Sequence, residues 1–285
     1  MRVLDLCTGT GCIPLLFRHE FTERRKDVGL RTLGIDVSDK SVRLARHNYE
    51  QLAKRTETQS GPTDFAKADI LINPFADRVV GAPLPLKYVL NHNRWSPFWD
   101  ILISNPPYIS PSAYWKTTTR SVRLFEPKLA LVPPAITKLD DTAQGDLFYP
   151  RLLAIAQEVE AKIVLLEVAD MEQAIRVAQH ARNMDHFDGI MIWRDEPDAN
   201  PEQPTTEDGF EVQGAGNARS VVCWRGVGGP WLGKPEASKT VELETQADSE
   251  VKRISFWLPP PVERQFPLKR PRAAGHNRFR VQWDR

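Results

Sequence analysis

The chain has 285 residues, of which 41% are hydrophobic, and its formal net charge is +1. This length suits one large domain, or one domain and a tail, and the near-neutral charge argues neither for nor against a nucleic-acid partner. Three cysteines without a C-x-x-C pair argue against a zinc site and a disulfide framework, so we expect a reducing compartment. No apolar run approaches the roughly 20 residues of a membrane span. We expect no signal peptide ahead of the first strand, which begins at residue 2.

Short apolar runs alternate with amphipathic stretches along most of the chain. The predicted strands are residues 2–7, 31–38, 65–71, 98–104, 162–169, 187–194 and 219–225. The predicted helices are residues 12–21, 38–55, 146–160 and 171–184. Strands that alternate with helices are typical of βαβ units, so we predict an α/β fold with a mostly parallel sheet. The last two strands have no convincing helix between them and could pair antiparallel at the sheet edge.

Two stretches differ in composition from this pattern. Residues 195–209, between the last two strands, are polar and rich in proline, which indicates a surface insertion. After Arg225 the chain is rich in Gly, Pro and Arg, a composition that does not easily bury a core. We therefore expect one domain over residues 1–225 and a disordered or loosely docked tail over residues 226–285.

The first strand runs into the glycine-rich stretch "DLCTGTG" (residues 5–11). Glycines directly after a strand let a ligand approach the backbone, and the N-terminus of the next helix adds positive potential. A tight strand-to-helix turn without a ligand would use the same glycines. Pro14 stands where a dinucleotide motif has its third glycine, which argues against NAD or FAD and favours a ligand without a pyrophosphate.

Two further acids follow predicted strands. Asp36 ends the second strand, at a distance from the glycines where an acid can bind both ribose hydroxyls. By itself it could equally cap the next helix. Asp69 ends the third strand with Ile70 beside it, where a carboxylate can reach an adenine amino group and an apolar side chain can contact the ring. An ordinary aspartate at a strand end is the alternative.

The fourth strand ends in "NPPY", residues Asn105 to Tyr108. Two prolines give up two N–H donors and stiffen the chain. A stiffened turn would explain the prolines, but it would not explain Asn105 and Tyr108 on either side of them. Ligands of open α/β sheets bind at the carboxyl ends of the strands, so all these features are predicted to converge on one sheet edge.

Together, "VLDLCTGTGCI", "GIDVSDKSVRLARHN" and "ISNPPYIS" resemble the class I S-adenosylmethionine-dependent methyltransferases. "RLFEPKLAL", "GDLFYPRLL" and "LLEVADMEQAIRV" narrow the resemblance, over about residues 2–225, to the release factor glutamine N5-methyltransferase (HemK/PrmC-like) family. The resemblance implies a Rossmann-like fold with a seven-stranded, mostly parallel sheet and an antiparallel edge strand. Residues 77–95 and 195–218 look like insertions against a compact member. Family members begin with a helical domain ahead of the first strand, so this chain resembles an N-terminally truncated member.

The resemblance also implies a cofactor, S-adenosyl-L-methionine, and no metal. The residues implied to lie around its methionine part are Cys7, Thr8, Gly9, Thr10 and Gly11. Asp36 would bind the ribose, and Asp69 and Ile70 would lie at the adenine. The chemistry requires no thiol, so Cys7 and Cys12 look like small packing residues.

For catalysis, the resemblance implies that the Asn105 side-chain oxygen and the Pro106 carbonyl accept hydrogen bonds from the NH2 of a substrate glutamine. Pro107 would stiffen the loop, and Tyr108 would lie flat against the amide. Asn105 would also border the cofactor. We identify no residue that would act as the base.

The expected activity is therefore methyl transfer to a glutamine side-chain nitrogen in a peptide chain release factor. We expect a monomer that binds no membrane and meets nucleic acid only through the ribosome and its release factor. The resemblance favours a mitochondrial over a cytosolic location. Two alternatives stay open. A methylase of DNA or RNA amino groups shares "NPPY" and could use the basic tail. A non-catalytic, methyltransferase-like binding subunit is the other, although it would have no need of "NPPY" and Asp36.

Overall fold

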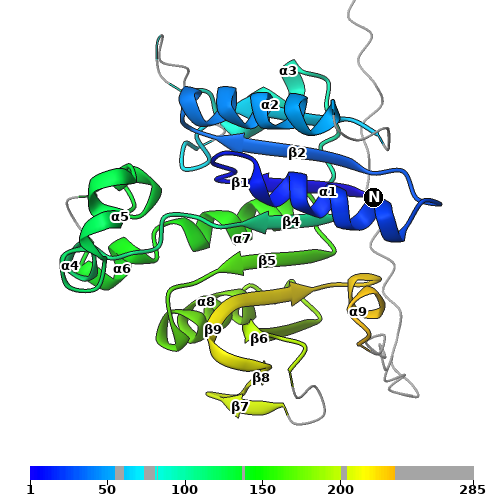
Figure 1. Ribbon diagram of the computed structural model, residues 1–285. Helices are drawn as coiled ribbons and strands as arrows, with labels where there is room; N and C mark the ends of the chain where they lie inside the picture. The colour runs from blue at the N-terminus through cyan, green and yellow to red at the C-terminus, as the bar shows by residue number, and fades with distance from the viewer. Residues whose placement is uncertain (55–60, 74–80, 82, 137–138, 200–203, 235–285) are drawn as a thin grey trace, which may run out of the picture. The chain divides into compact units, whose positions relative to one another are not determined.

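The computed structural model describes residues 1–54, 61–73, 81, 83–136, 139–199 and 204–234, all within the compact unit Met1–Lys239. Within these residues, nine strands form a single sheet. The strands are β1 (Arg2–Leu6), β2 (Arg31–Asp36), β3 (Thr63–Lys67), β4 (Ile101–Ser104), β5 (Ile163–Glu167), β6 (Gly189–Glu196), β7 (Thr205–Glu207), β8 (Phe210–Gln213) and β9 (Ala215–Trp224). Their order across the sheet is β3-β2-β1-β4-β5-β9-β6-β8-β7 (Figure 1).

The directions of the strands confirm the predicted α/β class and its mostly parallel sheet. Strands β1 to β5 run parallel to their neighbours, whereas β9 runs antiparallel to both β5 and β6. The last two predicted strands therefore do pair antiparallel. Two expectations need correction for the described part of the chain. The sheet has nine strands rather than seven, and the antiparallel strand β9 lies between β5 and β6, while β7 pairs antiparallel with β8 at the sheet edge.

The two additional strands lie in the stretch that we expected to be a surface insertion. Strands β7 and β8 form a hairpin there, joined by Asp208 and Gly209, whose φ angles are 48° and 76°. Such a turn favours an Asp-Gly pair because both residues need positive φ. In β8, Phe210 and Val212 are buried while the residues after them are partly exposed. This alternation is too short to be recognised among polar, proline-rich neighbours.

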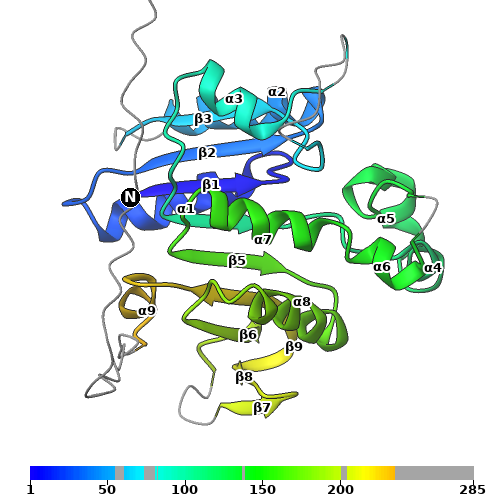
Figure 2. The same cartoon turned by 180° about the vertical axis from the view of Figure 1, so that it is seen from behind.

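Helices cover both faces of the sheet. The helices at the start of the chain are α1 (Cys12–Arg24), α2 (Asp39–Ala53) and α3 (Leu86–His92). Those around the carboxyl end of β4 are α4 (Pro111–Lys116), α5 (Arg120–Phe125), the 3-10 turn η1 (Lys128–Ala130) and α6 (Asp141–Gly145). The last are α7 (Phe148–Glu158), α8 (Met171–Asn183) and α9 (Gly228–Trp231). Figures 1 and 2 show α1 and α2 on one face, and α3, α7 and α8 on the other.

The main hydrophobic core lies between the sheet and the helices α3, α7 and α8 on one of its faces. In α7, Leu152, Leu153 and Ile155 expose none of their surface. Burying each such side chain contributes about 1.5–3 kcal/mol, so this helix holds the central strands firmly. On the other face, Leu15 and Val42 pack on the sheet through Phe65. The strand ends are thus carried by a sheet packed on both faces.

Two short helices lie in stretches that we expected to be an insertion and a tail. Helix α3, within residues 77–95, places Leu86, Val89 and Leu90 in the main core. Helix α9 lies beyond Arg225, whose backbone N–H donates to the Lys162 carbonyl at 2.9 Å, next to the start of β5. Residues 226–234 are therefore packed on the domain. The rest of the expected tail, residues 235–285, lies outside the described residues.

Candidate active site

The strand order places the predicted site residues in one row. Strands β3, β2, β1, β4 and β5 are parallel neighbours, so their carboxyl ends lie side by side. The residues at or just beyond these ends, in the same order, are Asp69, Asp36, Cys7–Gly11, Asn105–Tyr108 and Glu167. Chain order reverses between β1 and β4, which is where open α/β sheets bind ligands. The structure thus brings the predicted residues to one edge.

The loop after β1 has an unusual backbone. Cys7, Gly9 and Gly11 have φ angles of 62°, 54° and 80°, so a non-glycine residue adopts the left-handed region at the loop's start. Such conformations cost of order 1–3 kcal/mol and cluster at functional sites. A Cβ on Gly11 would lie 2.9 Å from the Phe65 ring, whereas a Cβ on Gly9 would meet nothing within 4 Å. The backbone at Gly9 is therefore open to a ligand.

Asp36 links this loop to the next helix. Its Oδ2 accepts a hydrogen bond from the Gly9 N–H at 2.9 Å, and its Oδ1 accepts one from the Ser38 N–H at 2.8 Å. Each carboxylate oxygen has a second lone pair for a further donor. Ser38 itself caps α2, because its hydroxyl accepts from the Ser41 N–H. Asp36 is therefore not the helix cap, and its remaining lone pairs suit a diol.

Asp69 and Ile70 differ in what they offer to a ligand. Asp69 lies just beyond β3, where its N–H donates to the Leu84 carbonyl and its Oδ1 accepts from the Leu71 N–H at 2.9 Å. Its side chain is half-buried, and its Oδ2 has no hydrogen bond described. Ile70 packs in the main core with 5% of its surface exposed, so it presents little area to a ring.

Asp5 is the most perturbed acid of this region. It lies wholly buried at the sheet interior, and within the described chain neither of its side-chain oxygens has a hydrogen-bond partner. Burial, opposed by the Thr8 hydroxyl and aided by the nearby Asp36 charge, raises the pKa of Asp5 to about 7. Burial likewise raises the pKa of the Cys7 thiol well above its usual range. Cys7 therefore stays a thiol, as expected of a packing residue.

The "NPPY" stretch leaves β4 with its asparagine exposed. Asn105 is exposed, whereas Pro106 and Pro107 are buried. Just before it, the buried Ser104 hydroxyl donates to the Leu6 carbonyl at 2.7 Å, which joins the carboxyl ends of β4 and β1. This hydrogen bond therefore holds the end of β4, and with it Asn105, beside the glycine-rich loop.

The ring of Tyr108 is held by Glu167, at the end of β5. The Tyr108 hydroxyl donates to Glu167 Oε1 at 3.0 Å. Burial, together with the smaller effect of the Glu167 charge, raises the pKa of Tyr108 to about 12. The phenol therefore stays protonated and keeps donating, which fixes the ring in place.

Gln173, in the first turns of α8, holds the backbone of the same tyrosine. Its Nε2 donates to the Tyr108 carbonyl at 3.2 Å and to Asp146 Oδ1 at 2.8 Å. Its Oε1 accepts from the Ala169 N–H at 2.8 Å. Sequence reasoning missed both Gln173 and Glu167. An acid after an apolar strand could have singled out Glu167, whereas Gln173 carries no signal in the sequence.

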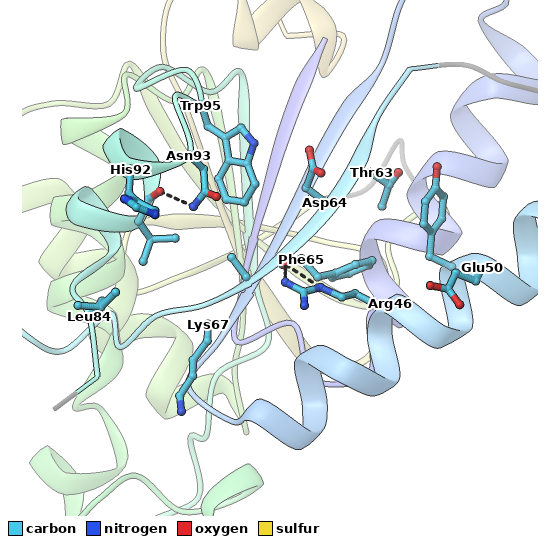
Figure 3. A pocket seen from close by; sticks show the side chains of 13 residues that line it. Arg46, Glu50, Thr63, Asp64, Phe65, Lys67, Leu84, His92, Asn93 and Trp95 are labelled. Atoms are coloured by element: carbon cyan, nitrogen blue, oxygen red, sulfur yellow. Dashed lines mark hydrogen bonds between the residues drawn. The ribbon is translucent and has the colours of Figure 1, made fainter. Parts of the chain in front are cut away.

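Two cavities differ in their relation to this row. One, of about 470 Å³, is lined by Tyr108, Ser110 and Gln173 and borders the "NPPY" stretch. The other, of about 500 Å³, lies at the outer edge of β3 (Figure 3). There the Arg46 guanidinium donates to the Phe65 carbonyl at 2.6 Å, on the edge of the sheet away from β1 and β4. We therefore place the candidate site at the strand ends.

Two further findings concern metal binding and membrane spanning. Among the described residues, no group of three or more His, Cys, Asp or Glu side chains is arranged to hold a metal ion. None of the described helices is long and apolar enough to cross a lipid bilayer.

Comparison with known proteins gives sequence relatives but no match to a protein-family model. The "Release factor glutamine methyltransferase" of Chlorobaculum tepidum is 37% identical over 132 residues, which are 46% of this chain and 35% of that protein. The "Probable MRF1 mitochondrial N(5)-glutamine methyltransferase" of Schizosaccharomyces pombe is 32% identical over 132 residues, 46% of this chain and 36% of that protein. The matches thus span about a third of each relative's length.

Solved structures add little to this comparison. The N-terminal domain of human METTL16 matches 78% of this chain and 60% of its own, at 15% identity and a TM-score of 0.41. So distant a likeness carries no argument, and the strand order of this chain itself assigns the Rossmann-like class I methyltransferase fold. Over the matched 132 residues, which are 46% of the chain, its sequence is similar to those of these two glutamine methyltransferases.

Proposed function

We propose that this chain transfers a methyl group from S-adenosyl-L-methionine to the side-chain amide nitrogen of a glutamine in a peptide chain release factor. One observation carries the proposal. The exposed Asn105 of "NPPY" stands beside the open backbone at Gly9, on strand ends joined through Ser104. An amide-orienting group and a cofactor cradle thus share one edge. The names of the relatives support glutamine as the target.

The residues available fit the proposed cofactor. The Gly9 backbone has room for a close approach, and Asp36 keeps lone pairs for two ribose hydroxyls after accepting from Gly9 and Ser38. Asp69 would accept a hydrogen bond from the adenine amino group. The buried Ile70 would contribute little surface to the site. The remaining residues proposed to surround the methionine part are Cys7, Thr8, Thr10 and Gly11. When bound, S-adenosyl-L-methionine supplies a methyl group on a sulfonium, ready for an in-line displacement.

The protein's own task would be orientation. The lone pair of an amide nitrogen is delocalised into its carbonyl, so the nitrogen is a weak nucleophile. In our proposal the Asn105 side-chain oxygen and the Pro106 carbonyl accept the two N–H groups of the substrate amide. Those acceptors favour the positive charge that develops on nitrogen during transfer. The buried Pro107 and the doubly held Tyr108 keep this geometry rigid, so positioning can supply much of the acceleration.

The proposal extends to the compartment. One relative is named as a mitochondrial enzyme, so we propose a mitochondrial release factor as the first substrate to try. A bacterial factor is the second choice, because the other relative comes from a bacterium.

The test is a methyl-transfer assay with labelled S-adenosyl-L-methionine and purified release factors. We expect label on one factor, lost when its target glutamine is replaced. Asn105→Ala should lower kcat by at least a hundredfold with little change in the circular dichroism spectrum. Asn91→Ala, at an exposed position on α3, should keep normal turnover and is the matched control.

Other outcomes would contradict the proposal in different ways. Label on DNA or RNA, and on neither factor, would support an amino-group methylase. Normal turnover in Asn105→Ala would refute the role of "NPPY". An absence of label together with no cofactor binding by calorimetry would support a non-catalytic binding subunit.

A further inference from the structure

The segment that follows "NPPY" exposes an unusual share of apolar surface. Six of the twelve large hydrophobic side chains that are exposed among the described residues fall between residues 115 and 139. Helix α5 and the turn η1 bury none of their residues. The exposed side chains that we call the α4–η1 face are Trp115 (66%), Leu124 (66%), Phe125 (85%) and Leu129 (49%). Large apolar side chains exposed in one segment in this way point to an interaction site.

This face is tied to the candidate active site. Helix α4 begins at Pro111, three residues after Tyr108, with the Ser110 hydroxyl as its cap. Beyond η1 the chain returns to the same loop, because the Ile109 N–H donates to the Leu131 carbonyl at 2.9 Å. Figures 1 and 2 show α4, α5 and α6 together beyond the carboxyl end of β4. A molecule bound to this face would therefore lie next to the loop that carries Asn105.

The face is also basic. Between residues 111 and 136 stand four cations, at 116, 120, 123 and 128, against one anion, Glu126. Asp140 and Asp141 follow at α6, where Asp141 accepts hydrogen bonds from Ser110 and Ser112. The Arg123 guanidinium lies over the Trp115 ring, 5.4 Å from its centroid, and donates to the Trp115 carbonyl. The Lys128 ammonium lies over the Tyr114 ring, 5.5 Å from its centroid. Arg123 and Lys128 thus lie over aromatic rings, and none of the four cations forms a salt bridge in the described chain, although the Lys116 charge contributes to the lowered pKa of Asp141.

We propose that the α4–η1 face docks the protein substrate itself, through a surface segment that combines apolar side chains with carboxylates. The net positive charge selects an acidic partner. Leu124 and Leu129 offer nothing to a phosphate or a base, so a protein fits better than a nucleic acid, which would need more cations and stacking rings. This inference rests on the proposed function, because it names how the substrate of that site is held.

The test compares a whole release factor with a peptide of about 15 residues around its target glutamine. Phe125→Ser should raise KM for the whole factor roughly tenfold, as loss of a central aromatic contact commonly does, with kcat nearly unchanged. The same variant should leave kcat/KM for the peptide unchanged, because the peptide does not reach the face. Phe98→Ser is the matched control, since Phe98 is 44% exposed just before β4, at the opposite end of that strand.

Calorimetry of the factor with each variant keeps this inference separable from the activity. Wild type and Phe98→Ser should bind about tenfold more tightly than Phe125→Ser, whether or not label is transferred. Label on the peptide with equal binding by all three proteins would leave the proposed function standing and overturn the docking face. No factor binding by wild type would overturn it as well. The docking face would also be overturned if Phe125→Ser kept its binding of the factor and lost only self-association in sedimentation, or only RNA binding.

Discussion

Replacing the buried Asp5 by asparagine should remove a specific pH dependence from the stability of this domain. Asp5 is fully buried at the end of β1, where the described chain offers its carboxyl oxygens no hydrogen bond. Burial raises its pKa from 3.8 to about 7. Between these two values the native state keeps a proton that the unfolded state has released. Stability is therefore lost as the pH rises through this window, because the native state binds more protons.

The expected size follows from the two pKa values. At 1.36 kcal/mol per pKa unit, a rise from 3.8 to about 7 corresponds to about 4 kcal/mol once both states are ionised. Most of the accessible change lies between pH 5 and pH 8, where linkage predicts a loss of roughly 2.5 kcal/mol. Asparagine has the same shape and no titratable proton, so its curve should lack this loss. Its buried amide adds a cost that does not change with pH.

The assay is urea unfolding followed by circular dichroism at several pH values from 5 to 8. The quantity of interest is the stability difference between Asp5→Asn and wild type, which should shift in favour of the variant as the pH rises. Asp208→Asn, in the exposed turn between β7 and β8, is the control and should follow wild type throughout. Parallel curves for Asp5→Asn and wild type would refute the raised pKa.

Two further predictions concern the site and its support. Asp36→Ala should weaken S-adenosyl-L-methionine binding in calorimetry by tenfold to about a hundredfold, because it removes charge-assisted acceptors from the ribose and from the Gly9 N–H; an unchanged Kd would contradict its role. Gln173→Leu should destabilise the domain by about 3 kcal/mol in urea unfolding, since it strands buried partners such as the Tyr108 carbonyl and the Ala169 N–H. Gln179→Leu, on the same helix with one exposed hydrogen bond, should cost under about 0.5 kcal/mol, and equal losses would show that Gln173 is no special support.

Some elements were readable from local patterns and others were not. Helix α2 has a polar cap and a long amphipathic repeat, so its limits of Asp39–Ala53 lie within two residues of the prediction. Helices α4 and α5 have six residues each, which is less than two turns. A period of 3.6 residues cannot be recognised over so short a length. The hairpin of β7 and β8 escaped prediction for a similar reason, despite its Asp-Gly turn.

By itself, the sequence determined where the strands end and which residues stand there. The glycines, Asp36 and "NPPY" could be located because turns and periodicity are local properties of the chain. Only the tertiary structure decided that β1 pairs with β4, which puts the glycine-rich loop beside Asn105. It also decided that Gln173 reaches Tyr108 and that Asp5 is buried without a partner. These facts depend on contacts between residues far apart in the chain, which no local pattern encodes.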